Sequence, residues 1–326
     1  MIGVDRTAAE VPPRPRLVAL VGPTAGGKTE LALALAPELD AEIVSVDSRQ
    51  VYRRLDVGTA KPDRAARAAV PHHLLDVVEP DEPYDAACFA RDARAAVADV
   101  LARDRNVLLV GGSGLYLRAL TDGLCPAPPA DAEVRAALAG ELAVRGVGAL
   151  HDELRALDPE AAARIAARDA VRICRALEVQ RLTGRPLSEW QRAHGFADRP
   201  YDVLVQVLCP PPDQLELRIA LRCEAMWQGG LLAETEAVLA AGFSPELRPL
   251  QAIGYREAQA YLRGALDRAQ AVERMRIATR QYAKRQRTWF RALAGATWID
   301  GREPLASILR RSDAFLRRGA DAAHVS

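Results

Sequence analysis

Long apolar runs and an excess of one charge are both missing from this chain of 326 residues. Leu17–Val21 is among the longest apolar stretches, far short of the roughly 18 residues that a membrane span needs. The N-terminal sequence MIGVDRTAAEVPPRPR lacks the apolar centre of a secretory signal. We therefore expect a cytoplasmic protein with no membrane partner.

The charge balance and the cysteines exclude further classes. Lys and Arg number 44 and Asp and Glu 43, giving a net charge of +1, so a globally basic nucleic-acid binder is excluded but a local basic face is not. With 49% hydrophobic and 27% charged residues, the chain is not disordered. The five cysteines form no CxxC pair, which argues against a disulfide framework and a zinc ribbon.

Lysine is scarce among the basic residues. Of the 44, only Lys28, Lys61 and Lys284 are lysines. A coding bias toward arginine is the simplest explanation. Against such a bias, a retained lysine is more often found where a planar guanidinium cannot replace a compact ammonium.

Strand and helix patterns alternate in the first third of the chain, which indicates an α/β fold with a parallel sheet. Short apolar runs predict strands, and amphipathic segments between them predict helices. The strands are expected at Arg16–Val21, Ala41–Val46, Leu74–Val78 and Asn106–Val110, and the helices at Thr29–Leu39 and Asp85–Arg103.

The pattern changes after Gly123, where prolines predict a linker. Helical periodicity continues to His194, Tyr201–Cys209 reads as another strand, and Thr297–Asp300 as a late edge strand. Two long helices are expected between these strands, at Asp213–Ala241 and Leu266–Ala294. The predicted organisation is a loose arm at 1–15, a core at 16–123 and 201–301, a helical insertion at 124–200, and a tail at 302–326.

The segment GPTAGGKT fits the phosphate-loop pattern G-x-x-x-x-G-K-[ST]. It follows a predicted buried strand and begins a predicted helix, which is the context that the pattern requires. Its backbone amides and Lys28 would bind phosphates, and the Thr29 hydroxyl would bind Mg²⁺. The predicted diphosphate-binding residues are Gly22, Pro23, Thr24, Ala25, Gly26, Gly27, Lys28 and Thr29.

A carboxylate follows the second predicted strand, in SVDSRQVY. Asp47 would lie in the crevice at the carboxyl ends of the strands, where it could act as a general base or hold water on a metal ion, unless it only caps a helix. Nucleotide hydrolases usually place an aspartate after a later strand. Here NVLLV ends in Gly111 and Gly112 instead, which argues against NTP hydrolysis.

Seven collinear segments together resemble the tRNA dimethylallyltransferases, also called tRNA isopentenyltransferases. The resemblance covers about residues 16 to 300, and its segments are GPTAGGKT, SVDSRQVYRRLDVGTAKP, PHHLLDVVEP, VGGSGLYLRAL, RICRALEVQRLTGRPLSEW, QAIGY and TRQYAKRQRTWFR. It implies a core like that of P-loop NTPases. It also implies transfer of a dimethylallyl group from dimethylallyl diphosphate to N6 of adenosine 37, beside the tRNA anticodon.

The resemblance assigns roles to particular residues. Asp47 matches the general base, Arg222 matches the catalytic arginine, and Lys28 and Thr29 complete the catalytic set with Mg²⁺ on Thr29. The anticodon stem-loop is the implied RNA partner. The residues that match RNA-contacting positions are Asp47, Ser48, Arg49, Gln50, Ser113, Arg135, Val171, Arg172, Ile173, Cys174, Arg175, Leu250, Gln251, Ala252, Ile253, Gly254 and Tyr255.

Two positions depart from the family pattern. Gly26 stands where serine is usual, and Cys88 stands where a polar or acidic residue is common. Gly26 bears on the placement of the diphosphate and not on the class of reaction.

A basic helix is expected near the C-terminus. Residues 274–291 contain seven basic residues and no acidic one. At about 100° per residue, five of these residues form one stripe, and an apolar set with Met275 and Tyr282 lies opposite. A solvated face is the alternative to a polyanion footprint. The stripe consists of Arg276, Arg280, Lys284, Arg287 and Arg291, and we expect the last four to bind tRNA.

Other functions share parts of this pattern. A P-loop small-molecule kinase would use the insertion as a lid and Arg218 and Arg222 as lid arginines, but would not need the basic stripe. A regulatory ATPase and prenyl transfer to free AMP or ADP are further alternatives. Nothing in the sequence requires more than a monomer. His72 and His73 are expected to have structural roles.

Overall fold

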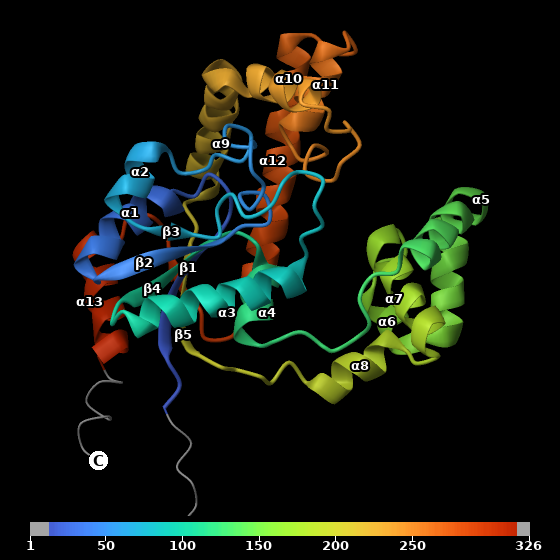
Figure 1. Cartoon of the computed structure of the whole chain (residues 1–326), viewed down its shortest axis with the longest axis horizontal. Coiled ribbons are helices and arrows are strands. Elements are labelled where there is room, and N and C mark those ends of the chain that lie inside the picture. The colour runs from blue at the N-terminus through green and yellow to red at the C-terminus, as the bar shows by residue number, and fades with distance from the viewer. Residues whose placement is uncertain (1–12, 318–326) are drawn as a thin grey trace, which may run out of the picture. The chain divides into compact units, whose positions relative to one another are not determined.

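The computed structural model describes residues 13–317, so that residues 1–12 of the expected arm and 318–326 of the expected tail lie outside the described residues. The chain forms two compact units. The helical unit is Asp122–Arg199, and the core unit consists of the other described residues (Figure 1). The insertion predicted at 124–200 overlaps the helical unit, whereas Pro200 belongs to the core unit.

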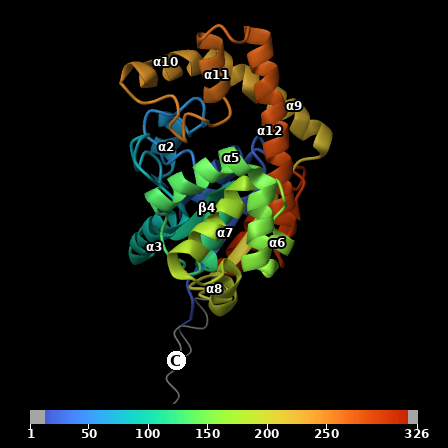
Figure 2. The same cartoon turned by 90° about the vertical axis from the view of Figure 1, so that its right-hand side faces the viewer.

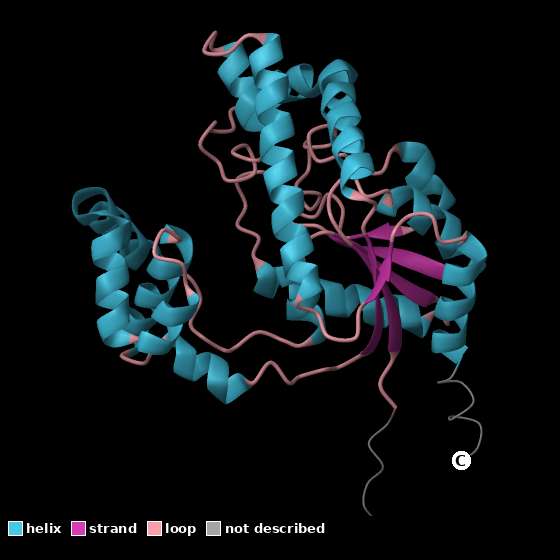
Figure 3. Ribbon diagram, turned by 180° about the vertical axis from the view of Figure 1, so that it is seen from behind, coloured by secondary structure: helices cyan, strands magenta, loops and turns pink. Residues whose placement is uncertain are grey.

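The core unit contains one parallel sheet of six strands, in the order β3-β2-β4-β1-β5-β6 (magenta in Figure 3). The predicted α/β fold with a parallel sheet is confirmed. Strand β1 lies between β4 and β5. It pairs with β4 through Val18 and Leu108 and with β5 through Val18 and Leu204. The strands are β1 Arg16–Val21, β2 Ala41–Val46, β3 His72–His73, β4 Asn106–Gly111, β5 Asp202–Leu208 and β6 Thr297–Ile299.

Both faces of the sheet are buried, because successive side chains of a strand point to opposite faces. In β1, Leu17, Ala19 and Val21 belong to one apolar core, and Val18 and Leu20 belong to the other. Helices α3 (Ala86–Ala102) and α4 (Gly114–Thr121) cover the first face, and α1 (Lys28–Glu38) and α13 (Leu305–Arg317) the second. Burial on both faces explains why the strands are continuously apolar.

One predicted strand is wrong. The segment Leu74–Val78 is irregular, and β3 lies just before it at His72–His73. Leu74 and Asp76 have φ angles of 63° and 55°, which a strand does not allow. Only Val78 forms an isolated bridge, with Tyr52. The short helix α2 (Arg64–Ala69) precedes β3, with Asp63 as its N-cap.

Four helices extend the core unit beyond the carboxyl ends of the strands, and α10 and α11 lie together at the top of Figure 2. The helix expected at Asp213–Ala241 is interrupted by a π-helical turn, η1 (Trp227–Leu231), where Gly230 has a φ of 106°. The helices are α9 Pro212–Met226, α10 Leu232–Ala240, α11 Tyr255–Leu262 and α12 Arg268–Arg291.

The buried face of α12 differs in part from the predicted one. Met275 is buried as expected, whereas Tyr282 is only partly buried. The buried face continues instead through four residues that include two polar ones, because α9 and the loops of the sheet pack there. These residues are Thr279, Ala283, Gln286 and Phe290.

The helical unit has its own apolar core, formed by side chains such as Leu138, Leu150 and Leu177. Its longest helix is kinked at Gly146, which has a φ of 77°. Asp158 caps the second helix through the Ala161 amide. The helices are α5 Ala132–Leu157, α6 Pro159–Arg164, α7 Ala170–Thr183 and α8 Leu187–His194.

Candidate active site

The loop between β1 and α1 folds as a cradle that requires glycine. Gly22 has a φ of 145°, and a Cβ atom there would lie 2.2 Å from the Leu208 carbonyl oxygen. At Gly26 a Cβ would lie 2.9 Å from the Pro23 oxygen. The glycine at this position therefore lets the loop turn tightly, and the serine usual in the family would require a small shift.

Lys28 lies in the centre of the cradle. Its ammonium donates to the carbonyl oxygens of Gly22 at 3.0 Å and Pro23 at 2.8 Å. Desolvation, aided by the nearby Arg222 guanidinium, lowers the pKa of Lys28 to about 8, although Asp47 acts in the opposite direction. A site that depresses a lysine pKa in this way favours an anion beside it.

A cavity of about 560 Å³ opens on the cradle. The side chains around it come from the ends of several strands and from α9 and α12. The Arg218 guanidinium donates to the Gly26 oxygen at 3.3 Å. The predicted residues Thr24 to Thr29, Asp47, Gln50, Arg218 and Arg222 line this cavity, together with Tyr282 and Gln286.

Asp47 follows β2 and faces the cavity. Its Oδ1 accepts the backbone amides of Arg49 at 2.8 Å and Gln50 at 3.4 Å. No hydrogen bond to its Oδ2 is found among residues 13–317. The turn amides therefore orient the carboxylate, and its second oxygen remains available for a ligand.

A second cavity, of about 310 Å³, adjoins the first and shares Thr24, Asp47, Arg222 and Tyr282 with it. Its lining is more apolar. It includes Cys223, Met226, Ala252, Ile253 and Met275, and also Ser48, Arg49, Gly58, Thr59, Gln251, Thr279 and Arg285. Because the two cavities meet at Asp47 and Arg222, a group held in each would be close to the same carboxylate and guanidinium.

Two residues of α12 that were not among the predicted site residues belong to the site. Gln286 is buried, accepts the Thr24 amide at 2.8 Å and donates to the Gly112 oxygen at 2.9 Å. Tyr282 lines both cavities, and its burial, with Asp47 nearby, raises its pKa to about 12. The segment TRQYAKRQRTWFR was the available signal, but its pattern predicted a binding role only for the basic residues.

Ser113 connects two parts of the site. Its Oγ accepts a hydrogen bond from the Ser48 amide at 3.0 Å, which joins the loop after β4 to the turn after β2. The two preceding glycines leave no space for side chains, because a Cβ on Gly111 would lie 2.0 Å from the Val46 oxygen. The strand end that carries an aspartate in hydrolases is therefore used for close packing.

The segment QAIGY has a more structural position than expected. Leu250 and Tyr255 have no exposed surface, so their side chains are not available to RNA. The Tyr255 hydroxyl donates to Glu234 at 2.5 Å. Glu234 also accepts the backbone amides of Asp56, Val57 and Gly58. Tyr255 therefore supports the loop that follows Asp47.

Four of the five residues of the predicted basic stripe, all except Arg276, border a groove between α9 and α12 with a volume of about 340 Å³. Arg280 is paired with Glu216 at 2.6 Å, and Arg276 with Glu273 at 3.0 Å. The remaining basic side chains of the groove have no ion pair among the described residues. They are Lys284, Arg287 and Arg291.

The remaining predicted RNA contacts belong to the helical unit. Glu178 is buried and accepts both Arg135 at 2.9 Å and Arg175 at 2.6 Å. Val171 and Arg172 are exposed, Cys174 is partly buried and Ile173 is fully buried. Ile173 belongs to the apolar core, so its side chain is unavailable to RNA.

The adjacent histidines have structural contacts, as expected. His72 Nδ1 contacts the Val70 oxygen at 2.7 Å, and His73 Nε2 contacts Glu42 at 2.7 Å. Within residues 13–317 there is no cluster of three His, Cys, Asp or Glu side chains placed to hold a metal ion. The same part of the chain has no helix that could span a membrane.

Comparison with known proteins agrees with this arrangement. The sequence model of the IPP transferase family matches residues 50–293. A tRNA dimethylallyltransferase of Stenotrophomonas maltophilia (strain K279a) is 51% identical over 306 residues, which cover 92% of this chain and 94% of that protein. One from Anaeromyxobacter dehalogenans (strain 2CP-C) is 53% identical over 284 residues, covering 87% and 94%.

Solved structures give the same result. The tRNA isopentenylpyrophosphate transferase of Bacillus halodurans superposes with a TM-score of 0.69 at 36% identity, covering 95% of this chain and 99% of that one. A eukaryotic dimethylallyltransferase acting on tRNA superposes with a TM-score of 0.71 at 27% identity, covering 85% of this chain and 70% of that one. The P-loop NTPase-like core is thereby confirmed. With the glycine cradle, the aspartate after β2 and these matches, the chain belongs to the IPP transferase family.

Proposed function

We propose that this protein is a tRNA dimethylallyltransferase that modifies N6 of adenosine 37. The observation that supports this most directly is the junction of the two cavities. A cradle for phosphates and a more apolar cavity open on either side of Asp47 and Arg222. Such a junction suits the transfer of a carbon group from a diphosphate to a base.

The cradle would hold dimethylallyl diphosphate. Lys28 would give up its contacts with the loop carbonyls for phosphate oxygens, and Arg218 and Arg222 would neutralise the opposite side. As the bond between carbon and oxygen breaks, the electron pair stays on the diphosphate. Fixed positive charges around the leaving group lower the free energy of that step.

The target adenine would enter the second cavity after leaving the base stack of the anticodon loop. Its N6 forms the new bond to the dimethylallyl carbon, and the proton from N6 goes to Asp47. The oxygen Oδ2 is suited to accept this proton, because Oδ1 already accepts two amides. Tyr282 and Arg49 would contact the base or its neighbours from the walls of the cavity.

The residues present fit a magnesium ion. Thr29 lines the first cavity with its hydroxyl as the expected ligand, and Mg²⁺ usually takes one or two protein oxygens and completes its shell with water and phosphates. When bound, the ion would neutralise charge on the diphosphate.

For the RNA, we propose contacts from both units, with each unit contributing residues that the structure leaves accessible. In the core unit these are Ser48, Arg49, Gln50, Ser113, Gln251, Ala252, Ile253 and the groove residues Arg280, Lys284, Arg287 and Arg291. In the helical unit they are Arg135, Val171, Arg172, Cys174 and Arg175. Leu250, Gly254, Tyr255 and Ile173 would contribute only through backbone atoms.

We further propose that the enzyme acts as a monomer on cytoplasmic tRNA. Light scattering at micromolar concentration should give a single species of 35.3 kDa. A stable dimer under these conditions would contradict this part of the proposal.

The test is transfer of a labelled dimethylallyl group from its diphosphate to unmodified tRNA in the presence of Mg²⁺. Label on adenosine 37, lost when that base is replaced, would support the proposal. Label on AMP but not on tRNA would move the acceptor to a free nucleotide. Phosphate transfer from ATP to a metabolite, without prenyl transfer, would overturn the proposal in favour of a kinase.

A further inference from the structure

The loop from Asp56 to Lys61 contributes to both cavities. Ala60 lines the first cavity, and Gly58 and Thr59 line the second. Glu234 on α10 fixes the first half of the loop by accepting its three backbone amides. The position of this loop therefore affects the shape of the site on both sides of Asp47.

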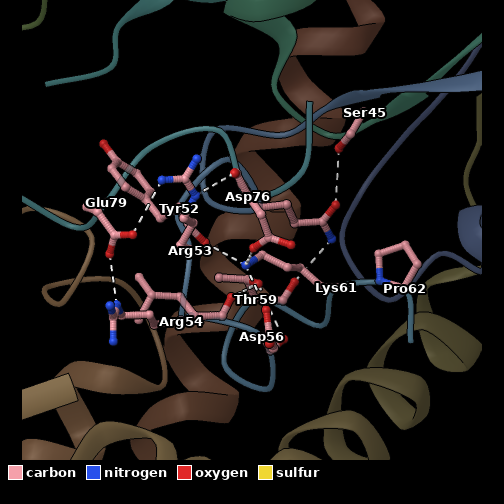
Figure 4. Close-up of polar contacts among 12 residues, drawn as sticks. Ser45, Tyr52, Arg53, Arg54, Asp56, Thr59, Lys61, Pro62, Asp76 and Glu79 are labelled. Carbon is pink, nitrogen blue, oxygen red and sulfur yellow. Dashed lines mark hydrogen bonds and ion pairs between the residues drawn. The ribbon is translucent and has the colours of Figure 1, made fainter. Parts of the chain in front are cut away.

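Lys61 lies at the other end of the loop, and its side chain is buried. Its side chain is only 1% exposed, although it carries a charge. Its ammonium donates to the Tyr52 oxygen at 2.5 Å, to Asp56 at 2.7 Å and to Asp76 at 2.6 Å (Figure 4). Three acceptors satisfy all three donors of an ammonium, so the buried charge is fully paired.

The geometry explains why a lysine is found here in a chain with only three of them. The three acceptors surround one nitrogen atom, and Arg67 already binds the other oxygen of Asp76 at 2.7 Å. A guanidinium spreads its donors over a plane and cannot direct them at three acceptors that surround a single atom. Arginine at position 61 would therefore displace the loop.

The loop is connected to Asp47 through Gln50. The Gln50 side-chain amide donates to the Ala60 oxygen at 3.2 Å and the Thr59 oxygen at 3.3 Å. Its backbone amide donates to Asp47 Oδ1. Displacement of the loop would thus move Gln50 and turn the carboxylate that accepts the proton in the proposed reaction.

We propose that Lys61 is a positioning residue for prenyl transfer: it holds the 56–61 loop so that Gln50 keeps Asp47 aimed at the acceptor. This inference rests on the proposed function. Lys61 itself does not line either cavity, and its three acceptors lie outside the phosphate cradle. We therefore expect its effect mainly on the catalytic step and only a small effect on diphosphate binding.

The test compares Lys61→Arg with Arg54→Asn. Arg54 forms a surface ion pair with Glu79 at 2.8 Å (Figure 4) and has a φ of 65°, which asparagine tolerates. For Lys61→Arg we expect kcat to fall by at least about tenfold, while the Kd for dimethylallyl diphosphate changes by less than about threefold. Arg54→Asn should leave both constants within about twofold of wild type.

A double-mutant cycle that combines Lys61→Arg with Gln50→Met tests whether Lys61 affects Asp47 through Gln50. If Lys61 acts through Gln50, the two losses in kcat should not multiply. Losses in kcat that multiply would overturn the inference. It would also be overturned if Lys61→Arg had a lower Tm but a wild-type kcat per diphosphate-binding site, because Lys61 would then only stabilise the fold. Asp76→Asn provides the same readout if Lys61→Arg does not fold. A wild type that transfers no prenyl group would remove the proposed function, and this inference with it.

Discussion

Asp47 shows how one residue can combine a turn and a catalytic task. Its Oδ1 accepts the amides of the following turn, which fixes the carboxylate against β2. Asparagine at this position preserves the turn, because its side-chain oxygen accepts the same bonds. Asparagine cannot take up a proton from the substrate amine. An asparagine variant therefore separates the structural role of Asp47 in the turn from its proposed role as proton acceptor.

For Asp47→Asn we therefore expect kcat to fall by about 10²–10⁴. Binding of dimethylallyl diphosphate, measured by calorimetry, should stay within about threefold because the cradle is unchanged. A variant that retains wild-type kcat would show that another group accepts the proton.

The depressed pKa of Lys28 predicts a pH dependence of diphosphate binding. With a pKa of about 8, Lys28 is half protonated at pH 8 in the free enzyme and fully charged only about one pH unit lower, and the bound anion stabilises the protonated form. The affinity for inorganic diphosphate, compared at each pH with that of Lys28→Met so that titration of the ligand itself cancels, should fall as the pH rises through 8, with proton uptake by Lys28 on binding. Calorimetry in buffers of different ionisation enthalpy measures this uptake, and Lys28→Met should abolish it.

At the scale of elements, α12 connects parts of the core unit that are far apart in sequence. Gln286 joins the cradle after β1 to the loop after β4, and Tyr282 reaches both cavities. The same helix presents basic residues to the groove beside α9. Its buried face therefore assembles the site, and we propose that its exposed face attracts RNA.

For Gln286→Leu we expect the free energy of unfolding to fall by about 1–3 kcal/mol, because the Thr24 amide and the Gly112 oxygen lose their partner. The Kd for inorganic diphosphate should also rise, since the cradle is no longer fixed. Urea unfolding and calorimetry measure the two effects. Gln281→Leu, on the exposed side of the same helix, should change neither.

For Lys284→Glu we expect weaker tRNA binding for every RNA sequence, with the slope of log K against log salt reduced by about one. Lys284 is exposed and borders the groove. Filter binding at several salt concentrations measures the slope. An unchanged slope would place the RNA footprint elsewhere.

At the scale of the whole molecule, the two units predict separable effects on the two substrates. Arg172→Glu alters an exposed side chain of the helical unit and should raise the Kd for tRNA about tenfold, or by about 1.4 kcal/mol. The Kd for dimethylallyl diphosphate should not change. Arg164→Glu, a charge reversal on exposed α6, serves as control, and equal effects from both variants would argue against a specific contact.

The sequence alone determined the parallel sheet, the cradle and the aspartate beside it. These features depend on short-range rules: apolar runs form buried strands, and a glycine pattern before a helix leaves backbone amides free for phosphate. The strand β2 and the cradle therefore appear where the patterns placed them. The strand predicted at Leu74–Val78 is absent. Leu74 and Asp76 have left-handed backbone conformations there, and Asp76 binds Lys61 of the 56–61 loop.

Only the tertiary structure decided how distant segments complete the site. Gln286 binds a loop 262 residues earlier in the chain, and neither segment alone indicates the other. The structure also showed that Tyr255 and Ile173 are buried, which periodicity could not distinguish from exposure. The physical reason is that burial and hydrogen bonding depend on which elements pack together, whereas secondary structure depends mainly on neighbouring residues.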